Sequence, residues 1–125
     1  MHEKNILLKN HTSIKVGGEA KRYVEVNTAN ELLATLKFAN SNSLKTLVLS
    51  GGTNVIISDK GFDGVVIKLT NRDISRSGHK LSVDAGVYWD DLVKYCVEKG
   101  LIGIEAMSGI PGLVGAGVIK NIGAY

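Results

Sequence analysis

The sequence contains a single cysteine, Cys96, and a single proline, Pro111, among 125 residues. One cysteine cannot form a disulfide within the chain, and its isolation excludes the zinc sites that need several cysteines. The three histidines, His2, His11 and His79, lie far apart and show no paired ligand spacing. We therefore expect no metal site.

Long apolar runs and a strong net charge are also absent. No uninterrupted apolar run approaches the ~20 residues of a membrane-spanning helix, and the amino terminus has no apolar signal core. The formal net charge is only +3, and the lysines are scattered rather than gathered in a block. These features predict a cytoplasmic protein with neither a membrane nor a nucleic-acid partner, although mild basicity suits a phosphate-bearing ligand.

Two common phosphate-binding motifs are missing as well. No glycine loop closes with a lysine and a Ser/Thr, as a Walker A motif requires, and no Gly-x-Gly-x-x-Gly opens a helix after the first predicted strand. An NTPase and a Rossmann dehydrogenase are thus disfavoured. Asp90 and Asp91 are neighbours on a predicted helix and do not face each other, so they form no acid–base pair. The sequence predicts no catalytic residue.

Glycine, by contrast, is abundant, with 15 of 125 residues against a usual ~7%. The last seventeen residues hold five glycines interleaved with Ile, Val and Leu, which indicates a packed segment rather than a disordered linker. A glycine inside a regular element costs roughly 0.5–1 kcal/mol relative to alanine, so this density indicates positive φ or close approach of another group. We interpret residues 109–125 as the wall of a ligand site.

The first half of the chain predicts a strand, a helix and a second strand. Residues 22–27 are β-branched and aromatic, and residues 46–49 form a short apolar run typical of a buried strand. Thr28 and Glu31 between them have the spacing of a capping box. The helix should end within residues 40–43. Its apolar side is predicted to comprise Leu32, Leu33, Leu36 and Ala39, with Phe38 beside them.

A second glycine-rich segment, Ser50-Gly51-Gly52-Thr53-Asn54, follows the second strand directly. The carboxyl end of a strand is where open α/β sheets bind ligands, and two adjacent glycines can aim successive N–H groups into one anion-binding concavity. A simple β-turn between strands explains the segment equally well. The pair Gly17-Gly18 leaves the same two alternatives, a hairpin turn or a close backbone approach.

The second half predicts a strand at residues 64–69, a hairpin tip at residues 77–79 and a half-buried strand at residues 80–85. A second helix should begin near Tyr88 and end before Gly100, which fits a C′ glycine. Its apolar face is predicted to comprise Leu92, Val93, Cys96 and Val97. We expect Cys96 to be a buried, inert thiol and Trp89 to be a packing anchor in preference to a ligand contact.

Three separated motifs together resemble one family. The segments 11–20, 50–54 and 109–125 occur in the order found in the UDP-N-acetylenolpyruvoylglucosamine reductase family (UDP-N-acetylmuramate dehydrogenase, MurB). The resemblance covers about residues 10–125 and favours ligand contact over simple turns for the two glycine pairs. It implies an α+β fold, the FAD-binding domain of the vanillyl-alcohol-oxidase (PCMH) type, with FAD between two small lobes at residues 1–70 and 71–125.

The resemblance also implies the residues that bind the cofactor. The first lobe would cradle the FAD pyrophosphate, and the second would line the cofactor toward the flavin. This chain has Ala116 where the family usually has a glycine, and a methyl group there is small enough for FAD to fit. The implied cofactor-binding residues are Ser50, Gly51, Gly52, Thr53, Asn54 and Val55, with Ser108, Gly109, Pro111, Gly112, Gly115, Ala116, Ile119, Asn121, Gly123 and Ala124.

The activity implied is reduction of UDP-N-acetylenolpyruvoylglucosamine to UDP-N-acetylmuramate with NADPH, a step in peptidoglycan precursor synthesis. The family's proton donor and its UDP-sugar-binding domain lie further along than residue 125, so we expect the second lobe to be truncated and this chain to be inactive alone. The alternatives are a flavin- or nucleotide-binding module without catalysis and a structural domain with tight turns. If the Gly52 backbone approaches the pyrophosphate, Gly52→Val should abolish flavin retention and leave the apo fold largely intact.

Overall fold

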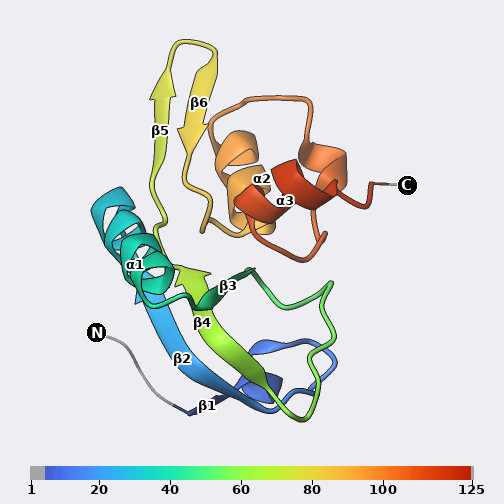
Figure 1. The fold of residues 1–125 in the computed structure, drawn as a ribbon. Coiled ribbons are helices and arrows are strands. Elements are labelled where there is room, and N and C mark those ends of the chain that lie inside the picture. The colour runs from blue at the N-terminus through green and yellow to red at the C-terminus, as the bar shows by residue number, and fades with distance from the viewer. Residues whose placement is uncertain (1–4, 125) are drawn as a thin grey trace. The chain divides into compact units, whose positions relative to one another are not determined.

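The computed structural model describes residues 5–124, which divide into two compact units with the boundary between Thr70 and Asn71. Both units combine helices with strands, which confirms the predicted α+β class (Figure 1). In the described range, no helix is long and apolar enough to cross a bilayer.

The first unit is built on a four-stranded sheet in the order β1-β2-β4-β3. Strand β2 (Glu19–Val26) pairs in parallel with β4 (Phe62–Leu69), and β4 pairs in parallel with β3 (Lys45–Leu49). The short β1 (Ile6–Leu7) adds an antiparallel edge, followed by the 3-10 turn η1 (Leu8–His11). The chain order of strand, helix and strand is as predicted, but β4 lies between β2 and β3.

Helix α1 (Ala29–Ser41) begins with the predicted capping box. The Thr28 hydroxyl accepts a hydrogen bond from the Glu31 N–H, and the Glu31 carboxylate accepts one from the Thr28 N–H. These bonds satisfy backbone donors that the first helical turn leaves unpaired. The helix ends at Ser41, within the predicted limits.

Both faces of the sheet are buried, because alternate residues of β2 and β4 enter two separate clusters. Val24, Val26, Val65 and Ile67 pack with α1, whereas Tyr23 and Val66 pack with Leu8, Leu49 and Ile57 on the other face. Figure 1 shows α1 beside β2 and β4. The central strand β4 is thus the most deeply buried part of the first unit.

Two sequence expectations about the first unit were wrong. Strand β3 was predicted to be buried, but it lies at the sheet edge and Val48 is 58% exposed. Leu33 and Leu36 were predicted on the buried side of α1, but both are exposed. The helix buries Ala39, as predicted, together with Thr35, and it packs on a narrower stripe than the pattern of three leucines and an alanine suggests.

The second unit contains the hairpin β5 (Ile74–Ser77) and β6 (Lys80–Val83), helix α2 (Trp89–Glu98), the turn η2 (Glu105–Met107) and helix α3 (Val114–Lys120). The hairpin tip lies at Gly78, as predicted, with φ of +60°. Val87, Leu92 and Cys96 form the core. The buried state predicted for Cys96 is therefore confirmed, and Gly100 follows α2 with φ of +64°, as a C′ glycine does. Val97 was predicted on the buried face of α2, but it is exposed; Tyr95 packs against the core instead.

Candidate functional site

The first glycine loop, Ser50–Asn54, leaves the carboxyl end of β3 beside the parallel strand β4. This is the position that the sequence predicts for it. Thr53 and Asn54 are exposed, whereas Gly52 is buried, and Val55 follows outside any strand. The loop thus has one side packed on the protein and one side in solvent. We call Ser50–Asn54 the 50–54 loop.

The buried side of this loop explains the glycine at position 52. Gly52 has φ of +68°, and a methyl group there would overlap the carbonyl oxygen of His11 and lie 2.8 Å from the Cα of Thr12. Ser13 donates to the Gly52 carbonyl oxygen from both its N–H (3.0 Å) and its hydroxyl (3.1 Å). The expectation that Gly52→Val leaves the apo fold intact is therefore wrong, because the fold itself needs glycine here.

The loop also carries hydrogen-bond donors without a partner in the described chain. In residues 5–124, no hydrogen bond within the chain is donated by the backbone N–H groups of Gly51, Gly52, Thr53 or Asn54. The Ser50 hydroxyl is buried and has no partner among the described atoms. Buried polar groups without a partner are rare in folded proteins, so the Ser50 hydroxyl indicates a polar ligand or ordered water. The N–H groups of the exposed residues can donate to water or to a ligand. An anionic group fits them.

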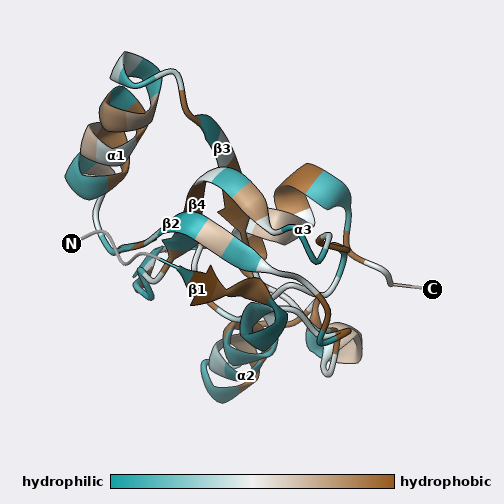
Figure 2. Ribbon diagram, turned by 60° about the horizontal axis from the view of Figure 1, so that its bottom comes forward, coloured by the Kyte–Doolittle hydropathy of each residue, from teal (hydrophilic) through white to brown (hydrophobic). Residues whose placement is uncertain are grey.

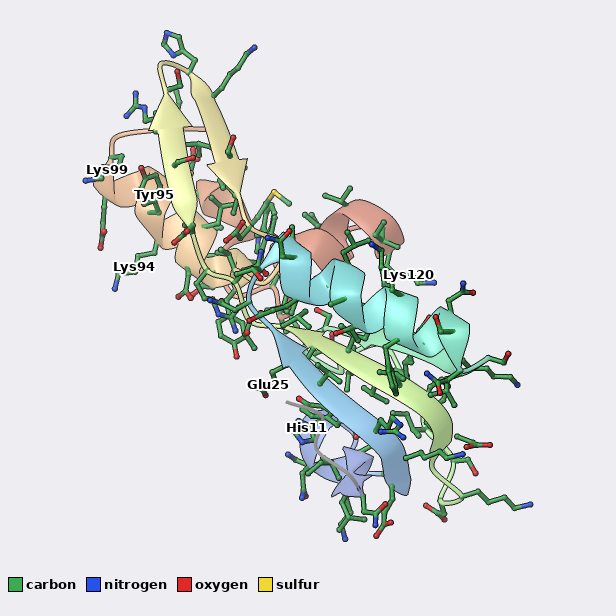
Figure 3. All side chains as sticks on the ribbon, turned by 60° about the vertical axis from the view of Figure 1, so that its left-hand side comes forward. His11, Glu25, Lys94, Tyr95, Lys99 and Lys120 are labelled. Carbon is green, nitrogen blue, oxygen red and sulfur yellow. The ribbon has the colours of Figure 1, made fainter. Side chains whose placement is uncertain are left out.

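His11, whose backbone packs against Gly52, is held by the side chain of Tyr23 in β2. The His11 and Tyr23 ring centroids lie 4.7 Å apart, and the Tyr23 hydroxyl lies 3.3 Å from both His11 Nδ1 and Glu25 Oε1. Figure 3 labels His11 and Glu25 at this cluster. Tyr23 is buried and contacts the side chain of His11, whose carbonyl oxygen is the atom nearest to a methyl group placed on Gly52.

The glycine pair at 17–18 makes a close backbone approach within the protein. A methyl group on Gly18 would overlap the Asp59 carbonyl oxygen and lie 2.7 Å from the Gly61 nitrogen. The Gly18 N–H donates to the Ser58 carbonyl oxygen at 2.9 Å. Of the two alternatives left open, the structure shows a close approach, and its partner is the turn at residues 58–61.

In the second unit, the start of α2 holds the segment Met107–Gly112, which we call the 107–112 loop. Trp89 donates from its indole Nε1–H to the Met107 carbonyl oxygen and from its N–H to the Gly112 carbonyl oxygen, both at 3.0 Å. Trp89 is half-buried against the core, so the predicted packing role is confirmed and a loop-anchoring role is added.

Asp90 holds the middle of the same loop, a role that sequence reasoning missed. Its Oδ1 accepts hydrogen bonds from the Ser108 hydroxyl and the Gly109 N–H, both at 2.7 Å. These donors hold the pKa of Asp90 below its ordinary value, the Gly109 N–H most of all. The sequence signal was an acidic residue in the first helical turn, which by itself indicates only favourable interaction with the helix dipole.

The glycines of this region serve different physical needs. Gly109 (φ +81°) and Gly112 (φ +131°) occupy left-handed backbone, and a methyl group on either would meet no atom within 4 Å. Gly115 instead packs on Ala85, whose Cβ would lie 2.7 Å from a methyl group at 115. The Gly115 N–H donates to the Ala85 carbonyl oxygen, and the Ala116 N–H donates to Leu113. Gly115 is therefore explained by packing within the unit.

The last described residues present an apolar surface. Val118 and Ile119 of α3 are 81% and 78% exposed, and Figure 2 shows apolar stretches on this helix. Asn121, with φ of +75°, ends α3, and Gly123 and Ala124 beyond it are exposed. Pro111 in the 107–112 loop is also exposed. Within the second unit, a bridge between Tyr88 and Leu113 joins α2 to this segment.

Comparison with known proteins identifies the domain. The FAD binding domain family matches residues 20–125, which include both glycine loops. The chain belongs to this family. This membership confirms the predicted type of fold, and the cofactor of the family is FAD.

The relatives are reductases of one kind. The chain is 42% identical over 127 aligned residues to a UDP-N-acetylenolpyruvoylglucosamine reductase of Thermobifida fusca, and 44% identical over 119 to one of Cutibacterium acnes. These alignments cover 98% and 91% of this chain but 36% and 32% of the relatives, so the chain spans about a third of their length. It thus corresponds to the FAD-binding portion of such a reductase.

A solved structure shows the same fold. The crystal structure of UDP-N-acetylenolpyruvylglucosamine reductase (MurB) from Thermus caldophilus matches with a TM-score of 0.74 and 31% identity. The match covers 94% of this chain and 42% of that one. The resemblance seen in the three sequence motifs is confirmed.

Proposed function

We propose that this chain holds FAD for an NADPH-dependent reductase that converts UDP-N-acetylenolpyruvoylglucosamine to UDP-N-acetylmuramate in the cytoplasm. The observation that carries the proposal is the match of the FAD binding domain family to residues 20–125, a range that contains every predicted contact residue. The reductases of Thermobifida fusca and Cutibacterium acnes, similar over nearly the whole chain, support the choice of reaction.

In this proposal the two units, as the two lobes of the FAD-binding domain, take different parts of the cofactor. The 50–54 loop would hold the pyrophosphate, because its N–H groups are unpaired within the described chain and the Ser50 hydroxyl has no partner there. Backbone N–H groups in a glycine turn form an anion-binding nest without bringing a side chain between loop and ligand. Thr53 and Asn54 would add side-chain hydrogen bonds to the pyrophosphate, and Val55, directly after the loop, would contact the cofactor as well.

The second unit would take an uncharged part of FAD, because a carboxylate faces its loop and several of its nearby donors are already bound. The Gly109 N–H is bound to the Asp90 carboxylate, whose negative charge disfavours phosphate, and the N–H of Gly115 is bound to Ala85. An exposed apolar surface and open glycine backbone suit a flat, uncharged ring system instead. The proposed contacts are Ser108, Gly109, Pro111, Gly112, Gly115, Ala116, Ile119, Asn121, Gly123 and Ala124.

Bound FAD would supply hydride transfer, the redox chemistry that protein side chains lack. The residues of this chain would bind and orient the cofactor. The substrate and NADPH would need the remaining two-thirds of a relative's length, so we propose that the chain alone produces no UDP-N-acetylmuramate. Orientation of reactants alone can contribute ~7–11 kcal/mol and general acid catalysis another 10²–10⁴-fold.

Two measurements test this function. FAD at 100 times its Kd should stabilise the chain by roughly 2.7 kcal/mol through mass action, which appears as a raised Tm. A Tm unchanged by excess FAD would contradict the proposal for this chain.

The second measurement follows formation of UDP-N-acetylmuramate from the enolpyruvyl substrate, NADPH and FAD, with a full-length reductase as positive control. We expect no product from the 125-residue chain, although slow NADPH oxidation by an exposed flavin is compatible with the proposal. Steady product would show that the chain carries the catalytic groups itself.

A further inference from the structure

The direction in which a backbone N–H points is set by the carbonyl of the same peptide unit, which belongs to the preceding residue. In a trans peptide the C=O of one residue and the N–H of the next point in opposite directions, and none of the peptide bonds in residues 5–124 is cis. Fixing a carbonyl on the protein side of a loop therefore turns the following N–H toward the other side. The 50–54 loop has two carbonyls fixed in this way.

The first is the carbonyl of Gly52. Ser13 donates to it from its N–H at 3.0 Å and from its hydroxyl at 3.1 Å. The N–H in the same peptide unit belongs to Thr53, which is exposed and donates no hydrogen bond within the described chain. Ser13 thereby directs the Thr53 N–H away from the protein.

The second is the carbonyl of Ser50. The Lys68 ammonium donates to it at 2.6 Å, a charge-assisted bond from the end of β4 to the end of β3. The N–H in that peptide unit belongs to Gly51, and it too donates no hydrogen bond within residues 5–124. Lys68 also places a positive charge against the loop, where it attracts an anion.

We propose that Ser13 and Lys68 are positioning residues that hold the 50–54 loop ready to receive the diphosphate of its ligand. The inference rests on the proposed function, and it assigns a role to two residues outside the predicted contact set. Neither residue needs to touch the ligand. A loop already fixed in its binding conformation avoids the ordering cost that a mobile loop would meet on binding.

The test compares three probes on the whole chain: FAD and ADP, which carry a diphosphate, and riboflavin, which carries none. Lys68→Met should weaken the binding of FAD and ADP about tenfold, or about 1.4 kcal/mol, and leave the affinity for riboflavin unchanged. Ser13→Ala should weaken the binding of the same two probes by about two- to threefold. The loss is smaller because the Ser13 N–H still donates to the Gly52 carbonyl oxygen. Lys68→Arg, which keeps a cationic donor, should restore most of the affinity.

Matched controls are Lys37→Met and Ser41→Ala, which make the same chemical changes at exposed positions of α1. They should bind all three probes like the unmodified chain. If Lys68→Met does not fold, Ser13→Ala provides the test, because it should lower the ratio of FAD affinity to riboflavin affinity. Equal losses for all three probes, or no loss for any, would overturn the inference while leaving FAD binding established. Failure of the unmodified chain to bind FAD or ADP would overturn the proposed function as well.

Discussion

The two glycine loops look alike in sequence and differ in how their backbone groups are used. In the 50–54 loop the carbonyls of Ser50 and Gly52 are bound by Lys68 and Ser13, while four successive N–H groups stay unpaired within the described chain. In the 107–112 loop the Gly109 N–H is bound to a carboxylate of the same unit, and the carbonyls of Met107 and Gly112 are bound by Trp89. Within residues 5–124, four N–H groups of the 50–54 loop are unpaired, whereas in the 107–112 loop those of Met107, Ser108 and Gly109 are bound and those of Ile110 and Gly112 are not.

This difference shows that glycine density alone does not identify a phosphate site. Gly52 is required because neighbouring backbone occupies the space of a side chain, whereas Gly109 is required by its φ angle alone. The partner of each amide, rather than the count of glycines, separates a loop rich in unpaired donors from one in which most donors are bound within the unit. The following predictions test that separation.

The largest expected effect compares Gly52→Ala with Gly109→Ala. At Gly52 an added methyl meets both left-handed strain and the backbone of residues 11–12, so we expect a loss of about 3–5 kcal/mol in unfolding free energy. At Gly109 only strain applies, and the loss should be about 1–2 kcal/mol. Urea unfolding followed by circular dichroism measures both. Equal losses would mean that the packing difference between the loops is not real.

An intermediate effect is expected for Gly115→Ala in the second unit. The added methyl would lie 2.7 Å from the Cβ of Ala85, so overpacking should cost about 1–3 kcal/mol. Combining it with Ala85→Gly should recover part of the loss, because the facing methyl is removed; the Cα and carbonyl oxygen of residue 85 would still lie 3.1 Å away. Urea denaturation of the single and double variants provides the comparison. Additive losses in the double variant would contradict the packing explanation for this glycine.

The smallest expected effect concerns Asp90, with Asp91→Asn as the matched control in the same helical turn. Because the Gly109 N–H and the Ser108 hydroxyl lower its pKa in the folded state, Asp90 stabilises the fold above the unfolded value of about 3.9. That contribution is lost as the pH falls through the lowered folded pKa. Asp90→Asn should therefore lower the Tm more than Asp91→Asn at neutral pH, and the gap should close in strong acid. A gap independent of pH would show that charge is not the cause.

Local chemistry made much of the fold predictable. The capping box at Thr28 and Glu31, the hairpin tip at Gly78 and the C′ glycine at 100 all depend on a few adjacent residues, and the structure shows each of them. Position in the sheet was not predictable in the same way. The apolar run of β3 indicated a buried strand, but burial depends on strand order, which is set by long-range pairing, and β4 rather than β3 lies inside the sheet.

The candidate site shows the same division between local and distant information. The place of the 50–54 loop at a strand end followed from the sequence pattern. The partners that give the two loops their different characters are distant in sequence: Ser13 for Gly52, Lys68 for Ser50 and Asp90 for Gly109. No local pattern indicates which serine, lysine or aspartate will meet which peptide group, so these roles became visible only in the folded chain.

The most direct test is a titration of the ¹⁵N-labelled chain with FAD, followed through its backbone amide resonances. If the 50–54 loop binds the diphosphate through its unpaired donors, the largest changes should occur at Gly51, Gly52, Thr53 and Asn54. Their amide proton resonances should shift downfield, as those of hydrogen-bonded amides do. The same shifts should be absent with riboflavin. The amides of Gly109 and Gly115, already bonded within their unit, should show no such change. Diphosphate-dependent shifts at Gly109 and Gly115, with none in the 50–54 loop, would contradict the account.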